Sequence, residues 1–313
     1  MKKNHNLIFC AEGGPAIWSL DYLIALSAVY IWTIYVFGMY DVHRILACSF
    51  SSSIILAFSM QMAFMHRVDT RKLLAAAVNG FVIGFLVPSD IPAWTIVLVV
   101  AVATIPYYLP YIGKYFARHL HPIGLAIVFM FLVFPWIKAK SGNCMIDISY
   151  PMTPLDSILD GFIPEEGIYD LLLGRHSGLI GEISVLMIAI GGIYLLARKV
   201  IRWYAPVSML VSLAVISYLL PVAGSRLDFL TAQMFTGGIF FTAVFLLPYF
   251  PIAPTTRNGG LVYGALVGVL TYVFRRYFNM FDGVYLALLI SAFVISFVEP
   301  ILTPQVILWK KDF

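Results

Sequence analysis

Two side chains in a long polar stretch could take part in chemistry on the water side of a membrane. The stretch runs from Ala139 to Gly178 and contains Asp147 and Thr153, six residues apart. The hydroxyl of Thr153 is an alcohol that can carry a covalently attached group, and Asp147 is an acid beside it. From spacing alone, the ordinary interpretation is a solvated or capping threonine.

A carboxylate and a hydroxyl follow that stretch, at Glu182 and Ser184. One interpretation is that Glu182 caps the start of a helix, where a negative charge gains about 0.3–1 kcal/mol from the helix dipole. The other is that Glu182 and Ser184 line an ion or proton path, because a carboxylate inside a membrane is costly unless it is paired. Glu299 and Asp21 allow the same two interpretations.

Metal sites and disulfides find little support in the sequence. His119 and His121 are two residues apart and so do not share a helix face. With Arg118 they are better suited to contact anionic headgroups or a partner subunit. The three cysteines have no Cys-x-x-Cys spacing. There is no basic stripe despite a net charge of +4, which argues against nucleic acid.

The composition indicates that these residues are positioned by membrane helices. The chain is 61% apolar and 12% charged, whereas soluble domains are about 45–50% apolar and about 25% charged. Apolar runs near twenty residues fit a helix that crosses about 30 Å of hydrocarbon. We therefore expect an all-α polytopic membrane protein. Residues 1–15 lack the apolar core and cleavage site of a signal peptide, so none is expected.

About ten transmembrane helices are predicted, and the third, fifth and ninth are short for a full span. Short segments interrupted by proline or glycine are typical of broken helices at the bilayer midplane. The predicted segments are Trp18–Met39, Ile45–Met65, Leu73–Val87, Pro92–Ile112, Pro122–Ile137, Leu179–Leu196, Ala205–Val222, Thr231–Phe250, Leu261–Phe274 and Gly283–Leu302.

The distribution of positive charge predicts the orientation. With the N-terminus inside, thirteen of the 20 lysines and arginines fall on the cytoplasmic side, as the positive-inside rule requires. Both termini are then cytoplasmic, and the polar loop 139–178 lies outside. We expect the chain in the inner (cytoplasmic) membrane of the cell.

Five predicted helices on each side of the loop indicate two inverted repeats, residues 1–138 and 179–313. A weak internal echo supports them: residues 79–88 and 237–248 are both rich in glycine and aromatic residues, and both end in proline. The alternative is that glycine and proline are simply frequent in membrane helices.

Several stretches resemble one family of membrane proteins. Residues 178–184 read Gly-x-Ile-Gly-Glu-x-Ser, and an apolar run leads to Gly-Gly-x-Tyr-Leu-Leu at 191–196 and a basic turn. Further similarity covers residues 234–241, 253–264 and 282–289, and it is thinner in the first half. The pattern resembles the RnfD/NqrB family. RnfD is a membrane subunit of the Rnf ion-translocating ferredoxin:NAD oxidoreductase, and NqrB is its counterpart in the sodium-translocating NADH:quinone reductase.

The resemblance implies a cofactor and a place for it. In that family a threonine in an outward loop carries FMN through a phosphodiester bond, in a pattern similar to Asp-x-x-Ser-Gly-Ala-Thr followed by Pro-Leu. Here the window has Asp147, Thr153 and the following Pro-Leu, but Tyr-Pro-Met replaces Ser-Gly-Ala. Proline fixes φ and removes an N–H where glycine allows positive φ, so the departure puts flavin attachment to Thr153 in doubt. A second departure is residues 247–251, which lack the family's turn aspartate.

The resemblance therefore implies a subunit of a membrane redox complex that carries electrons through flavin, coupled to Na⁺ or H⁺ translocation. FMN is the expected cofactor, with riboflavin or another second flavin as a further option. The chain has no Rossmann, P-loop or cysteine-cluster motif, so NADH and iron–sulfur sites would belong to partner subunits, and the chain would not be a complete enzyme. The expected partners are the other subunits of the complex, including iron–sulfur and flavin subunits. The alternative is a flavin-free permease, channel or structural subunit of the same architecture.

Overall fold

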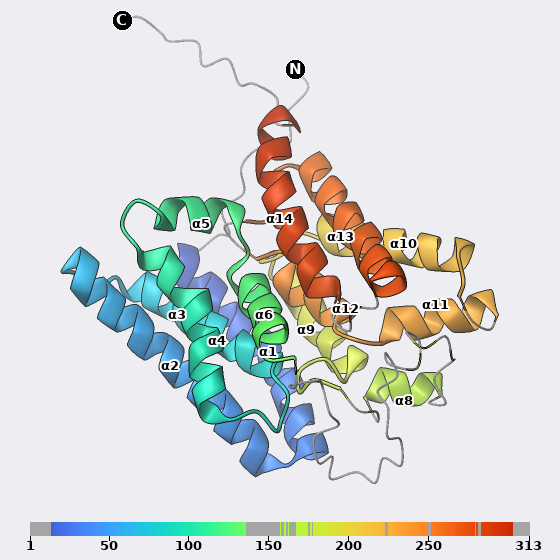
Figure 1. Ribbon diagram of the computed structural model, residues 1–313, viewed down its shortest axis with the longest axis horizontal. Helices are drawn as coiled ribbons and strands as arrows, with labels where there is room; N and C mark the ends of the chain where they lie inside the picture. The colour runs from blue at the N-terminus through green and yellow to red at the C-terminus, as the bar shows by residue number, and fades with distance from the viewer. Residues whose placement is uncertain are drawn as a thin grey trace, which may run out of the picture.

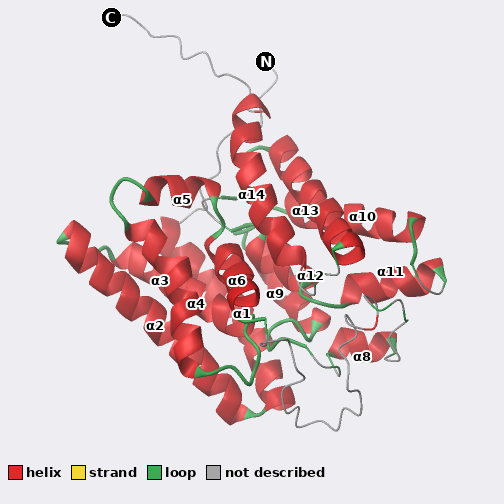
Figure 2. Ribbon diagram, viewed as in Figure 1, coloured by secondary structure: helices red, strands yellow, loops and turns green. Residues whose placement is uncertain are grey.

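The computed structural model describes residues 14–135, 157, 160, 162, 167–174, 176, 178–222, 225–249, 252–278, 280 and 283–302. Within these residues the secondary structure is helical and no strand occurs (Figure 2). The helices are α1 (Gly14–Phe37), α2 (Met39–Met65), α3 (Thr70–Phe85), α4 (Ala93–Tyr108), α5 (Gly113–His119), α6 (Pro122–Val133), α8 (Ile168–Leu173), α9 (Val185–Ala197), α10 (Tyr204–Leu219), α11 (Arg226–Phe235), α12 (Ile239–Phe241), the π-helix η1 (Thr242–Leu246), α13 (Arg257–Tyr277) and α14 (Gly283–Leu302).

The predicted all-helical polytopic membrane architecture is confirmed. Of the described helices, α2, α14 and residues 18–37 of α1 are long and apolar enough to span a bilayer alone. The number rises to five if each of two bent pairs counts as one span. Helices α6, α9 and α10 are apolar but shorter. Every predicted segment contains helix, but most of these helices are shorter than a complete crossing.

Polar side chains explain where several helices begin. Asp69 accepts a hydrogen bond from the N–H of Arg71 at the start of α3 (3.0 Å). Thr256 accepts one from Gly259 at the start of α13 (3.0 Å). Such caps satisfy backbone donors that have no partner within the helix.

Three predicted segments need correction. Helix α9 begins at Val185 and not at residue 179, because residues 180–184 form a turn that ends at a cap. The segment 231–250 is not one helix: it is divided into α11, α12 and η1, with a 58° bend. The ninth segment is not short, since α13 has 21 residues.

The packing partners recur in the two halves of the chain, which lie side by side (Figure 1). In the first half α2 packs on α3 and α4, and α4 packs on α6; in the second half α10 packs on α11 and α13, and α13 packs on α14. Across the halves, α1 packs on α9 and α6 on α14. Two copies of one five-element unit would produce this order of neighbours, although the repeat boundaries 1–138 and 179–313 stay a prediction.

Candidate functional site at the broken helix

The turn before α9 is folded into the helix bundle and carries Glu182 with it. The N–H of Gly181 donates to the carbonyl of Phe85, the last residue of α3, at 2.7 Å. A Cβ on Gly181 would meet the Phe85 side chain and carbonyl at 3.0 Å or less. This close approach fixes the turn against the end of α3, and Glu182 is only 7% exposed.

Ser184, and not Glu182, caps α9. The Ser184 hydroxyl accepts a hydrogen bond from the N–H of Met187 at 3.4 Å, and it lies 3.5 Å from the carbonyl of Leu172 in α8. The carboxylate of Glu182 instead accepts a hydrogen bond from the hydroxyl of Tyr285 in α14. The interpretation of Glu182 as the cap is therefore corrected, because the turn sends its side chain into the bundle.

The break in the eighth predicted segment lies against this pair. Gly237 and Gly238 both have positive φ, 58° and 63°, a conformation that glycine adopts without steric penalty. A Cβ on Gly238 would overlap the Glu182 carboxylate and lie 2.6 Å from the Tyr285 hydroxyl oxygen. Glycine is thus required here both by the backbone and by the close approach of the buried acid.

Arg275 holds the other side of the break. It lies in the last turn of α13 and is 2% exposed. One guanidinium nitrogen donates to the side-chain and backbone oxygens of Gln233, at 3.0 and 3.3 Å. The other donates to the carbonyls of Thr236 and Gly237, at 3.2 and 2.7 Å. Arg275 was not singled out from the sequence, so this role was missed; the glycine pair at 237–238 was the available signal for the break.

The two segments of the internal echo meet at this place. Phe85 belongs to residues 79–88, and Gly238 and Phe241 belong to residues 237–248. The rings of Phe85 and Phe241 are 6.3 Å apart. The turn of residues 180–184 therefore lies between corresponding segments of the two halves. We call Glu182, Tyr285, Arg275, Gln233 and the break at 236–238 the break cluster.

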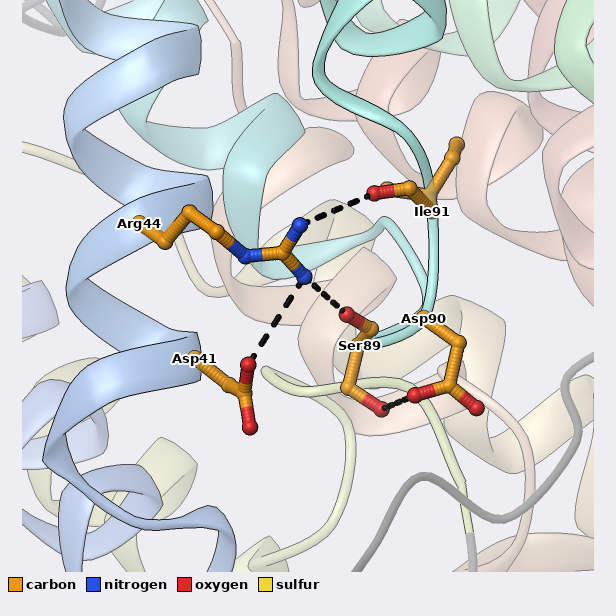
Figure 3. A network of polar contacts seen from close by, with 5 residues as sticks. All are labelled: Asp41, Arg44, Ser89, Asp90 and Ile91. Atoms are coloured by element: carbon orange, nitrogen blue, oxygen red, sulfur yellow. Dashed lines mark hydrogen bonds and ion pairs between the residues drawn. The ribbon is translucent and has the colours of Figure 1, made fainter.

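A second arginine holds the loop that follows α3. Arg44 donates to the carbonyls of Ser89 and Ile91, at 2.8 and 3.5 Å, and lies 3.7 Å from Asp41 (Figure 3). The Ser89 hydroxyl in turn donates to Asp90 at 3.4 Å (Figure 3). This network fastens the loop to the first turns of α2.

The corresponding loop of the second half is held in a similar way. Arg202, just before α10, donates to the carbonyl of Thr255. Glu299 accepts a hydrogen bond from the Thr255 hydroxyl at 2.8 Å. Asp21, the remaining acid considered from the sequence, is buried between Tyr194 and Arg198, with Oδ1 at 2.9 and 3.4 Å from them.

The two histidines have structural contacts. His119 Nδ1 lies 2.6 Å from the Ser296 hydroxyl. His121 Nδ1 accepts from the N–H of Gly124, so Nε2 carries the proton donated to the Leu246 carbonyl at 3.0 Å. Among the described residues no group of three or more His, Cys, Asp or Glu side chains could hold a metal.

Cys48 is half-buried in α2, with its sulfur 3.8 Å from the carbonyl of Ala93. Thr153 and Asp147, and with them the expected flavin attachment, lie outside the described residues, as do Cys10 and Cys144.

Comparison with known proteins identifies the family. The model of the NQR2, RnfD, RnfE family matches residues 17–308. An ion-translocating oxidoreductase complex subunit from Methanosarcina acetivorans is 29% identical over 90% of this chain and 88% of its own length. A Na⁺-translocating ferredoxin:NAD⁺ oxidoreductase complex subunit from Acetobacterium woodii is 26% identical over 80% of this chain and 77% of its own length. A proton-translocating ferredoxin:NAD⁺ oxidoreductase complex subunit from Clostridium ljungdahlii is 22% identical over 94% of this chain and 92% of its own length. The chain belongs to the NQR2, RnfD, RnfE family.

Proposed function

We propose that this protein is an integral membrane subunit of an ion-translocating electron-transport complex. The observation that carries the proposal is the family match over residues 17–308. Relatives that are named as subunits of such complexes also match this chain over most of their own length. The fold supports it, because the described helices form a membrane-type bundle around a buried acid. Iron–sulfur and further flavin subunits would be its partners.

The finer part of the proposal is that the subunit carries flavin, as FMN on Thr153. A flavin would supply one- and two-electron transfer, while the chain supplies position and electrostatics. What supports it is the Asp147 and Thr153 window followed by Pro-Leu. The Tyr-Pro-Met residues before Thr153 favour the alternative of a flavin-free structural subunit.

Flavin fluorescence in a denaturing gel of the purified complex separates these two possibilities. We expect a fluorescent band at the mass of this chain that is lost in Thr153→Ala and kept in Ser149→Ala, a control hydroxyl four residues away. A dark band from a complex whose other flavin subunits are loaded would refute covalent attachment and leave the flavin-free subunit.

The ion path is proposed to pass Glu182 and Ser184. Both side chains are buried, at 7% and 3% exposure, and the Glu182 carboxylate lies against Gly238 in the break. Unwound helix segments in transporters often surround ion sites. A Glu182→Gln variant should lose ion uptake coupled to electron transfer by reconstituted vesicles. Asp228→Asn, an exposed acid at the start of α11, should keep it.

The orientation is proposed as both termini cytoplasmic and loop 139–178 outside, in the inner membrane. The chain contains natural labels for a test, since Cys144 lies in the loop and Cys10 near the N-terminus. In intact cells a membrane-impermeant maleimide should modify a variant that keeps only Cys144 and spare one that keeps only Cys10. The reverse pattern would invert the topology.

A further inference from the structure

Arg275 occupies a place where membrane proteins commonly hold a cation. The last carbonyls of a helix lack backbone partners, and in a membrane they must be satisfied by protein or by a water-filled cavity. At the end of α11 the guanidinium of Arg275 takes the carbonyls of Gln233, Thr236 and Gly237, all within 3.3 Å. The amide oxygen of Gln233 adds a fourth acceptor at 3.0 Å.

These four acceptors are neutral oxygens that converge on one positive group. Carbonyl oxygens at the C-terminal ends of half-helices coordinate Na⁺ in transporters with broken helices, and rings of carbonyls bind K⁺ in channels. The negative end of the α11 dipole adds to the attraction for a cation. The four oxygens are therefore of the chemical type that binds a monovalent cation in such proteins.

We propose that the carbonyls of Gln233, Thr236 and Gly237, with the Gln233 amide oxygen, form a monovalent-cation site that Arg275 fills from within the chain. The built-in charge keeps the break stable without a bound metal ion. While the guanidinium is in place, it also excludes Na⁺ from these oxygens. The site stands on the described contacts alone and does not depend on flavin or on the proposed electron-transport role.

The chain offers a matched pair of arginines for the test. Arg275 is 2% exposed and contacts the break, whereas the adjacent Arg276 is exposed and lies 6.0 Å from the ring of Tyr277. The full-length protein is purified in detergent as Arg275→Ala and as Arg276→Ala. The unfolding temperature of each variant is then measured with low millimolar guanidinium chloride. In a separate series, NaCl is compared with choline chloride at equal ionic strength.

For Arg275→Ala we expect a lowered unfolding temperature that recovers in a saturable way with guanidinium, and partly with Na⁺ but not with choline. Binding to the folded state alone stabilises it by mass action. Urea has the shape of guanidinium without its charge, so it should give no recovery. Arg276→Ala should respond to none of them. Equal recovery with urea would mean that a void is being filled, and no recovery with any cation would refute the site.

A second pair of variants covers the case in which Arg275→Ala does not accumulate. Arg275→Lys keeps a positive charge, and Arg275→Met has a comparable length without charge. If a cation is needed at the break, the lysine variant should reach the membrane at several-fold higher levels than the methionine variant. Equal levels of the two variants would overturn the proposal, because packing would then explain the burial of Arg275.

Discussion

Replacing Gly264 by alanine should separate two helices that touch through their backbones. Gly260, Gly264 and Gly268 follow one face of α13, which packs on α10. A Cβ on Gly264 would overlap the Ala205 carbonyl oxygen and lie 3.0 Å from the nitrogen of Met209. Backbone atoms cannot rotate away as a side chain can, so the whole helix would have to shift.

The size of the effect follows from two opposing contributions. Inserting a methyl group into a packed interior costs about 1–3 kcal/mol, and replacing glycine by alanine within a helix returns about 0.5–1 kcal/mol. Gly260→Ala is the control, one turn earlier in α13. Its Cβ would have 3.5 Å to the nearest atom, the Cβ of Tyr204, which is ordinary contact. Both variants share the helix contribution, so the difference between them isolates the packing penalty, about 1–3 kcal/mol.

The assay is the unfolding of the purified protein in detergent, followed by tryptophan fluorescence. Because membrane proteins often unfold irreversibly, the unfolding rate at a fixed temperature is compared as well as the midpoint. Gly260→Ala should be as stable as the unaltered chain or more stable, and Gly264→Ala should be clearly less stable. Equal stability of the two variants would refute the backbone contact between α10 and α13.

Two further predictions concern the polar contacts. Tyr285→Phe removes the hydroxyl that donates to Glu182 and should lower the free energy of unfolding by about 1–3 kcal/mol, the range for removing one partner of a buried hydrogen bond. Tyr277→Phe changes a side chain that is 71% exposed and should have little effect, and equal losses would contradict a buried hydrogen bond. Arg44→Ala should raise amide hydrogen exchange in loop 86–92, since two carbonyl contacts are lost, and unchanged exchange there by mass spectrometry would show that Arg44 does not hold the loop.

Apolar runs predicted the positions of the helices well because lipid imposes one strong pattern. Helix α14 was predicted at its observed bounds. The start of α13 was missed, since its first turn contains Arg257, Asn258 and two glycines, which no apolar run includes. There the cap at Thr256, and not hydropathy, sets the boundary.

The break cluster was only partly predictable. Gly-Gly at 237–238 was visible in the sequence, and Glu182 was a candidate from its position in an apolar region. That Tyr285 and Arg275 would meet them depends on contacts between residues 38 to 103 positions apart. A hydropathy pattern contains no information on such pairings. Thr153 was a prediction from family resemblance, and it remains one.

The shortness of the central helices has an electrical consequence. Helices α6 and α9 have 12 and 13 residues, so each extends about 18–20 Å at 1.5 Å per residue, against about 30 Å of hydrocarbon. If water reaches the ends of these helices, the membrane voltage falls over that shorter distance. The local field there is then about 1.5 times steeper than across lipid. An ion crossing this region would gain its free energy, about 2.3 kcal/mol per 100 mV, over about 18–20 Å instead of about 30 Å.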